Sequence, residues 1–180
     1  MLAFDITTKF KLTDDASSLF KDTYSVTEFI SILRDNKVLI DAVKMYAHSL
    51  PVRYTVYWAY LCLLTELGVE KNPERLKLLD KTYSWVIDPN EKKRQEFKVI
   101  FDNLGLQDPI GCLAISIFWS GGSISGPDNP AVAAPPNAAS ETAANAIISR
   151  CIPFGGEMLA KLSIALDVGA DVVSKKRHWP

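Results

Sequence analysis

The sequence predicts an all-α protein, an irregular bundle of about seven to eight helices arranged as helical hairpins. Apolar residues recur at helical spacing along most of the chain. N-cap residues precede several of these stretches and glycines follow them. We expect the 180 residues to form a single helical domain around one main core. A proline-rich crossing of the surface is expected at residues 121–139.

The N-terminal part of the chain gives two different signals. Residues 1–12 alternate apolar and polar positions, which predicts a short extended segment or an ordered arm. Helix signals begin at Ser25, which forms a capping box with Glu28. A second helix is expected at about residues 37–49. The inward face of the first helix is expected to hold Val26, Phe29, Ile30 and Leu33.

The stretch from Pro51 to Gly68 predicts the central helix of the bundle. Proline suits a first helical turn and glycine suits a C-terminal end. Apolar residues cover nearly all faces of this stretch, which is typical of a buried helix. Two interpretations of Arg53 stay open: an internal ion pair or cap, or a polar anchor in a groove.

Three further helices are predicted to start where an N-cap residue precedes a proline. The charge run Glu91-Lys92-Lys93-Arg94 is interpreted as a solvated first turn, and Gly121-Gly122 is expected to end the third of these helices. The three starts are Asn72-Pro73, Asp88-Pro89 and Asp108-Pro109.

Two helices are predicted after the proline-rich crossing. Ser140 is expected to cap a helix at about 141–152, which Pro153 and the glycines after it would break. The last helix is expected at about 157–174, and residues 175–180 are expected to fray. Its inward residues are expected to be Leu159, Leu162, Leu166 and Val173.

Residues 118–136 combine an aromatic pair, glycines and prolines with a single charge, Asp128. No Lys or Arg occurs between residues 99 and 149. Such a segment is either well buried or in contact with a partner, since aromatic residues are favoured interface anchors. Trp119 is therefore interpreted either as a core residue or as a partner-facing one. The candidate partner-binding residues are Arg53, Tyr57, Trp58, Trp119, Ile124, Pro127, Pro130, Pro135 and Pro136.

Composition narrows the classes of function. The net charge is −1, which argues against a broad nucleic-acid surface or a polybasic membrane surface. The three cysteines are interpreted as buried free thiols, and no spacing predicts a zinc site. No catalytic, cofactor-binding or metal-binding motif is present, so we expect no cofactor, no membrane insertion and a cytoplasmic location.

Three stretches resemble a family of small proteobacterial proteins of unknown function. They are "LPVRYTVYWAYLC", "SWVIDPNEKKRQ" and "GLQDPIGCLAISIFWSGGSISGPDNPAVAAPP", and the resemblance covers about residues 12–175. The resemblance implies an association with type VI secretion gene clusters, near effectors and their adaptor chaperones. It supplies no catalytic residues.

Three hypotheses follow. The first is a non-enzymatic cytosolic adaptor or co-chaperone, accessory to the loading of a type VI secretion effector, with that effector or its adaptor chaperone as protein partner. The second is a structural or assembly protein that self-associates as a homo-oligomer through residues 109–127. The third is an enzyme of unknown class.

Overall fold

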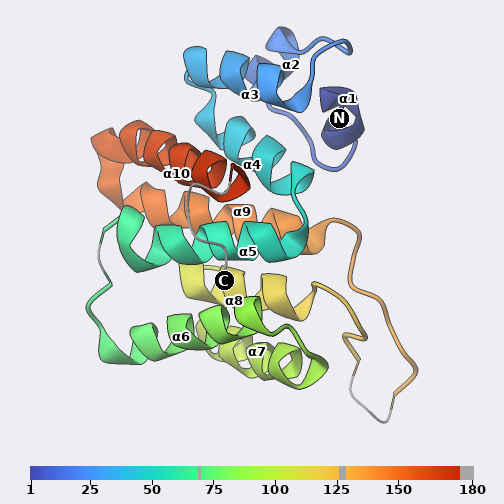
Figure 1. Cartoon of the computed structure of the whole chain (residues 1–180), viewed down its shortest axis with the longest axis vertical. Coiled ribbons are helices and arrows are strands. Elements are labelled where there is room, and N and C mark those ends of the chain that lie inside the picture. The colour runs from blue at the N-terminus through green and yellow to red at the C-terminus, as the bar shows by residue number, and fades with distance from the viewer. Residues whose placement is uncertain (69, 126–128, 175–180) are drawn as a thin grey trace.

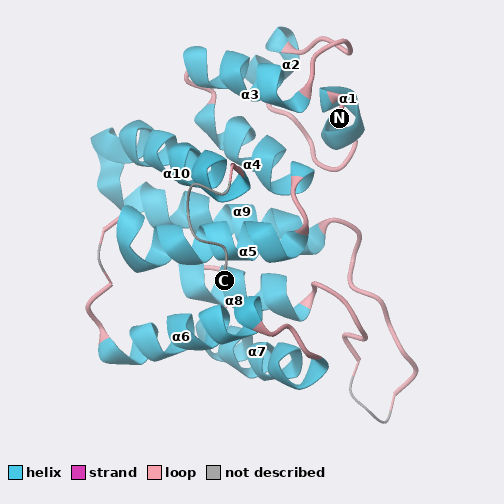
Figure 2. Ribbon diagram, viewed as in Figure 1, coloured by secondary structure: helices cyan, strands magenta, loops and turns pink. Residues whose placement is uncertain are grey.

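A computed structural model describes residues 1–68, 70–125 and 129–174. These residues form α-helices joined by loops, with no strand beyond two isolated bridges, so the all-α prediction is confirmed (Figures 1 and 2). The α-helices are α1 (Ala3–Thr7), α2 (Asp14–Leu19), α3 (Val26–Asp35), α4 (Leu39–Ser49), α5 (Val52–Leu61), α6 (Pro73–Ile87), α7 (Glu91–Leu104), α8 (Pro109–Phe118), α9 (Ala138–Cys151) and α10 (Met158–Val173). A π-helical turn (Cys62–Glu66) continues α5, and a 3-10 helix (Ile152–Glu157) joins α9 to α10.

The helices are stacked in a row. Figure 1 shows α3 near one end and α6 with α7 at the other, while α4 and α10, then α5 and α9, then α8 lie between them. Helix pairs that follow each other in the chain pack together, as α3 does with α4 and α7 with α8. Helix α9 joins distant segments, because it packs against α4, α5 and α8. The connection between α8 and α9 projects to one side of the stack (Figure 1).

The prediction of an extended segment at residues 1–12 is wrong. Residues Ala3–Thr7 form α1, and Ala3 and Ile6 are fully buried because their spacing of three places them on one helix face. The Ala3 N–H donates to the Tyr24 carbonyl oxygen at 2.8 Å, which attaches this helix to the loop before α3. The structure therefore has two short helices, α1 and α2, that are not among the helices predicted from the sequence.

Most of the predicted helix starts are confirmed, because N-caps act locally. Ser25 and Glu28 form the reciprocal capping box, and the side chains of Asn72 and Asp108 accept hydrogen bonds from the first turns of α6 and α8. The start at Asp88 is wrong. Asp88 ends α6, and Asn90 caps α7 by accepting a hydrogen bond from the Lys93 N–H at 3.0 Å.

Two predictions for the last helices are also wrong. Helix α9 begins at Ala138, so Ser140 lies buried in its first turn and Asn137 is the N-cap. In α10, Leu159 is 47% exposed and Val173 is 43% exposed. The buried residues of α10 run from Leu162 to Val172, so Leu159 lies before the covered stretch and Val173 lies just beyond it.

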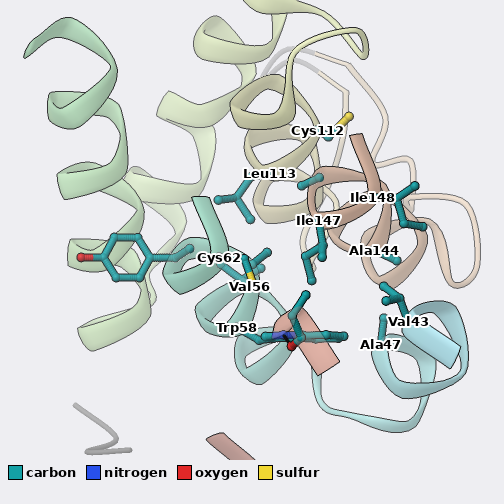
Figure 3. Close-up of a cluster of buried hydrophobic side chains, with 14 of the residues drawn as sticks. Val43, Ala47, Val56, Trp58, Cys62, Cys112, Leu113, Ala144, Ile147 and Ile148 are labelled. Atoms are coloured by element: carbon teal, nitrogen blue, oxygen red, sulfur yellow. Dashed lines mark hydrogen bonds between the residues drawn. The ribbon is translucent and has the colours of Figure 1, made fainter. Parts of the chain in front are cut away.

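A cluster of buried apolar side chains in the core joins α4, α5, α8 and α9 (Figure 3). Every residue of α8 after Pro109 is buried, so α8 lies at least as deep as α5, which was predicted to be the central helix. Within the range 109–127 considered for self-association, the apolar side chains of α8 pack against α7 and α9. Cys62, Cys112 and Cys151 are buried free thiols, as predicted.

Candidate partner-binding site

A buried arginine fixes the beginning of the proline-rich crossing. Arg94, in the first turn of α7, is 4% exposed and donates hydrogen bonds to the carbonyl oxygens of Phe118 and Ser123, the latter at 2.8 Å. Its guanidinium also binds both carboxylate oxygens of Glu91 at 2.7 Å and lies over the Phe118 ring. The interpretation of this charge run as a solvated turn is therefore wrong for Arg94. The last carbonyl of a helix lacks a donor from the helix itself, and Arg94 supplies one to the carbonyl oxygen of Phe118, the last residue of α8.

Ser123 closes the crossing into a loop. Its Oγ accepts a hydrogen bond from the Val132 N–H at 3.1 Å, and the Ile124 N–H donates to the Val132 carbonyl oxygen at 2.8 Å. Gly122, beside Ser123, has a φ of +63°, and a Cβ at this position would lie 2.7 Å from Arg94 Nη2. The two arms of the loop are therefore paired with each other and fixed against α7.

The two arms enclose a groove, which we call the loop groove. It has a volume of about 400 Å³ and lies between the end of α8 and the start of α9. None of the side chains that line it carries a charge. The lining residues are Val52, Trp119, Ser120, Gly121, Gly122, Ala133, Ala134, Pro135, Asn137, Ala139 and Ser140.

Several predicted partner-binding residues gather at this loop. Trp119 and Pro135 line the groove, and Trp119 also packs partly buried against the core, so both interpretations of Trp119 stay open. Pro130 and Pro136 are exposed on the loop, and Ile124 packs partly buried against the core. Pro127 lies outside the described residues.

The predicted cluster on α5 is not part of this groove. Trp58 is 0% exposed, and its Nε1–H donates to the Ala165 carbonyl oxygen at 2.6 Å, so it is a core residue rather than a partner contact. Tyr57 is buried beside Tyr60. Arg53 donates to the carbonyl oxygens of Val86 and Ile87, so it caps the end of α6, the first of the two interpretations considered for it.

A second hollow, which we call the lysine pocket, adjoins the loop groove. Its volume is about 310 Å³, and it shares Asn137 with the groove. No pattern in the sequence predicts this pocket, because its basic residues come from the segment after α1 and from α4, whereas its far wall is the start of α9. The lining residues are Lys9, Phe10, Lys11, Lys44, Pro136, Asn137, Ala138 and Glu141.

Glu141 is held in the wall of the lysine pocket by two side chains of α4. Its Oε2 accepts a hydrogen bond from His48 Nε2 at 3.0 Å, and its Oε1 accepts one from Lys44 Nζ at 2.6 Å. The hydrogen bond from His48, and then the one from Lys44, lower the pKa of Glu141 to about 2. The buried His48 ring stacks on Phe10, so this cluster joins α4 and α9 to the N-terminal segment.

Acid is expected to weaken the contact between α4 and α9 through Glu141. A carboxyl whose pKa is lowered by folding stabilises the protein fully above its unfolded value of 4.5, and this stabilisation is lost as the pH falls from 4.5 to about 2. Glu141→Gln should therefore lower the free energy of unfolding by about 1–2 kcal/mol at pH 7, allowing for the partial exposure of the carboxylate. Urea denaturation at a series of pH values would show the difference between the two proteins shrinking below pH 4.5. A difference that stays constant down to pH 2.5 would contradict this role.

The site is suited to binding by shape and hydrogen bonds. The loop groove offers an indole ring, proline, the hydroxyls of Ser120 and Ser140 and backbone groups, which together can hold an extended peptide. Across the described ranges, no group of three or more His, Cys, Asp and Glu residues is placed to hold a metal ion. In the same part of the chain, no helix has both the length and the apolar run needed to cross a bilayer.

Comparison with known proteins gives one match. The model of a family of unknown function, DUF6931, matches residues 29–173, which covers α4 to α10 and most of α3. The matched region contains the loop groove and all of the residues that fix it. No curated protein and no solved structure matches the chain.

Proposed function

The chain belongs to the DUF6931 family, whose function is unknown, and we propose that it is a non-enzymatic adaptor that binds a segment of a partner protein in the loop groove. The observation that carries the proposal is a groove without charged side chains whose two arms are fixed before any partner arrives. A site that is ordered in advance loses less conformational entropy on binding. Trp119 supplies the kind of aromatic anchor that dominates binding energies at protein interfaces.

We further propose that the adaptor acts in the cytosol, as a co-chaperone in the loading of a type VI secretion effector. The support for this step is the sequence resemblance to proteins associated with type VI secretion gene clusters. The partner would then be the effector or its adaptor chaperone.

Purification of the tagged protein from its native host tests this proposal. We expect the unmodified protein to capture more of the type VI secretion components than the Trp119→Ala variant does in a parallel purification. A preparation in which no secretion component is enriched would remove the support for the secretion role. If the Trp119→Ala variant captures the same proteins as the unmodified protein, the proposal that the loop groove is the binding site is wrong.

Trp119→Ala should separate stability from binding. Because the indole is only partly buried, its loss should lower the free energy of unfolding by about 1–2 kcal/mol, less than the roughly 3–5 kcal/mol expected for a fully buried tryptophan. The variant should therefore stay folded, and its binding of the partner should fall at least about tenfold, as for a hot-spot residue. Thermal melting and quantitative pull-down measure the two effects.

Val99→Ala is the matched control, because Val99 is an exposed apolar residue of α7 that does not line the groove. This variant should bind the partner like the unmodified protein. Equal loss of binding in both variants would mean that the effect of Trp119→Ala does not arise from the groove.

A further inference from the structure

We propose that the partner segment carries acidic side chains at one end, and that these side chains bind in the lysine pocket while the rest of the segment lies in the loop groove. This inference rests on the proposed function and names the chemistry of the partner. It is drawn from the position of the two hollows and from the charges that line each of them.

The two hollows meet across the first turn of α9. Asn137 lines both of them. On one side of it, Pro135 and Ala139 line the loop groove, and on the other side Pro136 and Ala138 line the lysine pocket. Because Asn137 lines both hollows, a segment that leaves the groove across this residue comes next to the lysine pocket.

The charges of the two hollows differ. The loop groove has no charged lining residue, whereas the lysine pocket has three lysines and a single carboxylate, Glu141. Both oxygens of that carboxylate are already bound by His48 and Lys44. The amino groups that remain to meet a ligand are those of Lys9, which also donates to the His48 carbonyl oxygen, and Lys11.

Lys11 is the clearest contact for an acidic group. It is exposed, and the described part of the chain offers it no hydrogen bond or ion pair. The N-terminal end of α9 adds a partial positive charge to the same wall, and the Asn137 side chain does not cap this end. A uniform polyanion, such as a nucleic acid, would have to place phosphates in the uncharged groove, so this pattern fits a peptide with apolar residues followed by acidic ones.

Binding of two labelled peptides tests the inference. Both begin with Leu-Pro-Ala-Leu-Pro; one continues with three glutamates and the other with three glutamines, and each is also made in reverse order. In fluorescence anisotropy, one order of the glutamate peptide should bind about tenfold more tightly than its glutamine counterpart, since each exposed ion pair contributes up to a few-fold in affinity. Raising the salt concentration from 0.05 to about 0.5 M should reduce that preference, because salt screens exposed charges.

Lys11→Glu supplies the matching variant, and Lys92→Glu, at an exposed position in the first turn of α7, is its control. Lys11→Glu should lower the affinity for the glutamate peptide about five- to tenfold and leave the affinity for the glutamine peptide unchanged. Lys92→Glu should change neither. Circular dichroism should show both variants folded, because both side chains are exposed.

The outcomes separate this inference from the proposed function. If the glutamate and glutamine peptides bind equally, or if Lys11→Glu behaves like Lys92→Glu, the inference is overturned. The adaptor proposal then still stands, provided that Trp119→Ala weakens both peptides. If neither peptide binds, the inference is also overturned, and purification from the native host decides the adaptor proposal by itself. If the glutamate peptide binds but Trp119→Ala does not affect it, the loop groove fails as the binding site.

Discussion

Replacing Arg94 by methionine is expected to lower the free energy of unfolding by about 2–5 kcal/mol, because two carbonyl oxygens lose a charged hydrogen-bond donor at about 1–3 kcal/mol each. Methionine keeps the apolar stem but has no N–H groups. The Phe118 carbonyl oxygen would then lose its Arg94 donor, and the Ser123 carbonyl oxygen would keep only a long hydrogen bond of 3.5 Å from Gln95 Nε2. Buried acceptors without a partner are costly, and little space exists for water around a side chain that is 4% exposed.

The effect on the loop should be visible apart from the effect on stability. Without Arg94, the start of the loop groove is no longer fixed to α7, so the fluorescence of the partly buried Trp119 should shift toward the spectrum of an exposed indole. Urea denaturation measures the stability. Arg94→Lys should be intermediate, because an ammonium group cannot reproduce the planar set of donors that a guanidinium offers.

Lys92→Met is the control for Arg94→Met, since the two positions lie in the same turn of α7 but Lys92 is exposed. We expect a change within about 0.5 kcal/mol for this control, as for most surface substitutions. An Arg94→Met protein as stable as the control would contradict the structural role assigned to Arg94.

Gly111→Ala should be the second severe substitution, with a loss of about 3 kcal/mol or more from overpacking. A Cβ at this position would lie 2.0 Å from the Gly105 carbonyl oxygen. Because that atom belongs to the backbone, no change of side-chain rotamer can relieve the contact. The end of α7 and the first turn of α8 would have to separate, and α8 is the helix whose residues after Pro109 are all buried.

Thermal unfolding measures this loss. For a chain of this length, about 3 kcal/mol corresponds to a fall in Tm of roughly 6–12 °C. Gly156→Ala is the control, because a Cβ at Gly156 would meet no atom within 4 Å. If the two variants have equal melting temperatures, the backbone at Gly111 does not lie as close to the Gly105 carbonyl oxygen as described above.

These two positions also matter for the proposed function. Arg94 and Gly111 fix the two ends of α8 against α7, and the loop groove begins where α8 ends. A variant that loosens α8 should therefore weaken partner binding without touching the partner. Comparison of Arg94→Met with Trp119→Ala would separate loss of preorganisation from loss of a contact.

The sequence by itself determined most of the helices. A helix start such as Ser25, Asn72 or Asp108 depends on hydrogen bonds within one turn, so residues two or three positions apart are enough to predict it. The short helices α1 and α2 were missed because five or six residues hold too few apolar positions to distinguish a helical period from an alternating one.

The loop was recognised from the sequence, but its structure was not. Prolines and glycines near Trp119 predict a surface connection, because they deny regular structure locally. They do not indicate that Ser123 closes the loop or that Arg94 holds it. Arg94 stands in a run of charges that is usually solvated, and the two carbonyl oxygens it binds are 24 and 29 residues further along the chain.

Only the tertiary structure brought the candidate site together. The lysine pocket takes Lys11 from the N-terminal segment, Lys44 from α4 and Glu141 from α9, and no spacing in the sequence joins these three positions. From the sequence, Trp58 was a candidate partner contact. Tertiary packing buries it in the core instead, where its N–H donates a hydrogen bond to the Ala165 carbonyl oxygen. Helices follow from contacts between near neighbours in the chain, whereas a groove and its charges depend on which distant helices pack side by side.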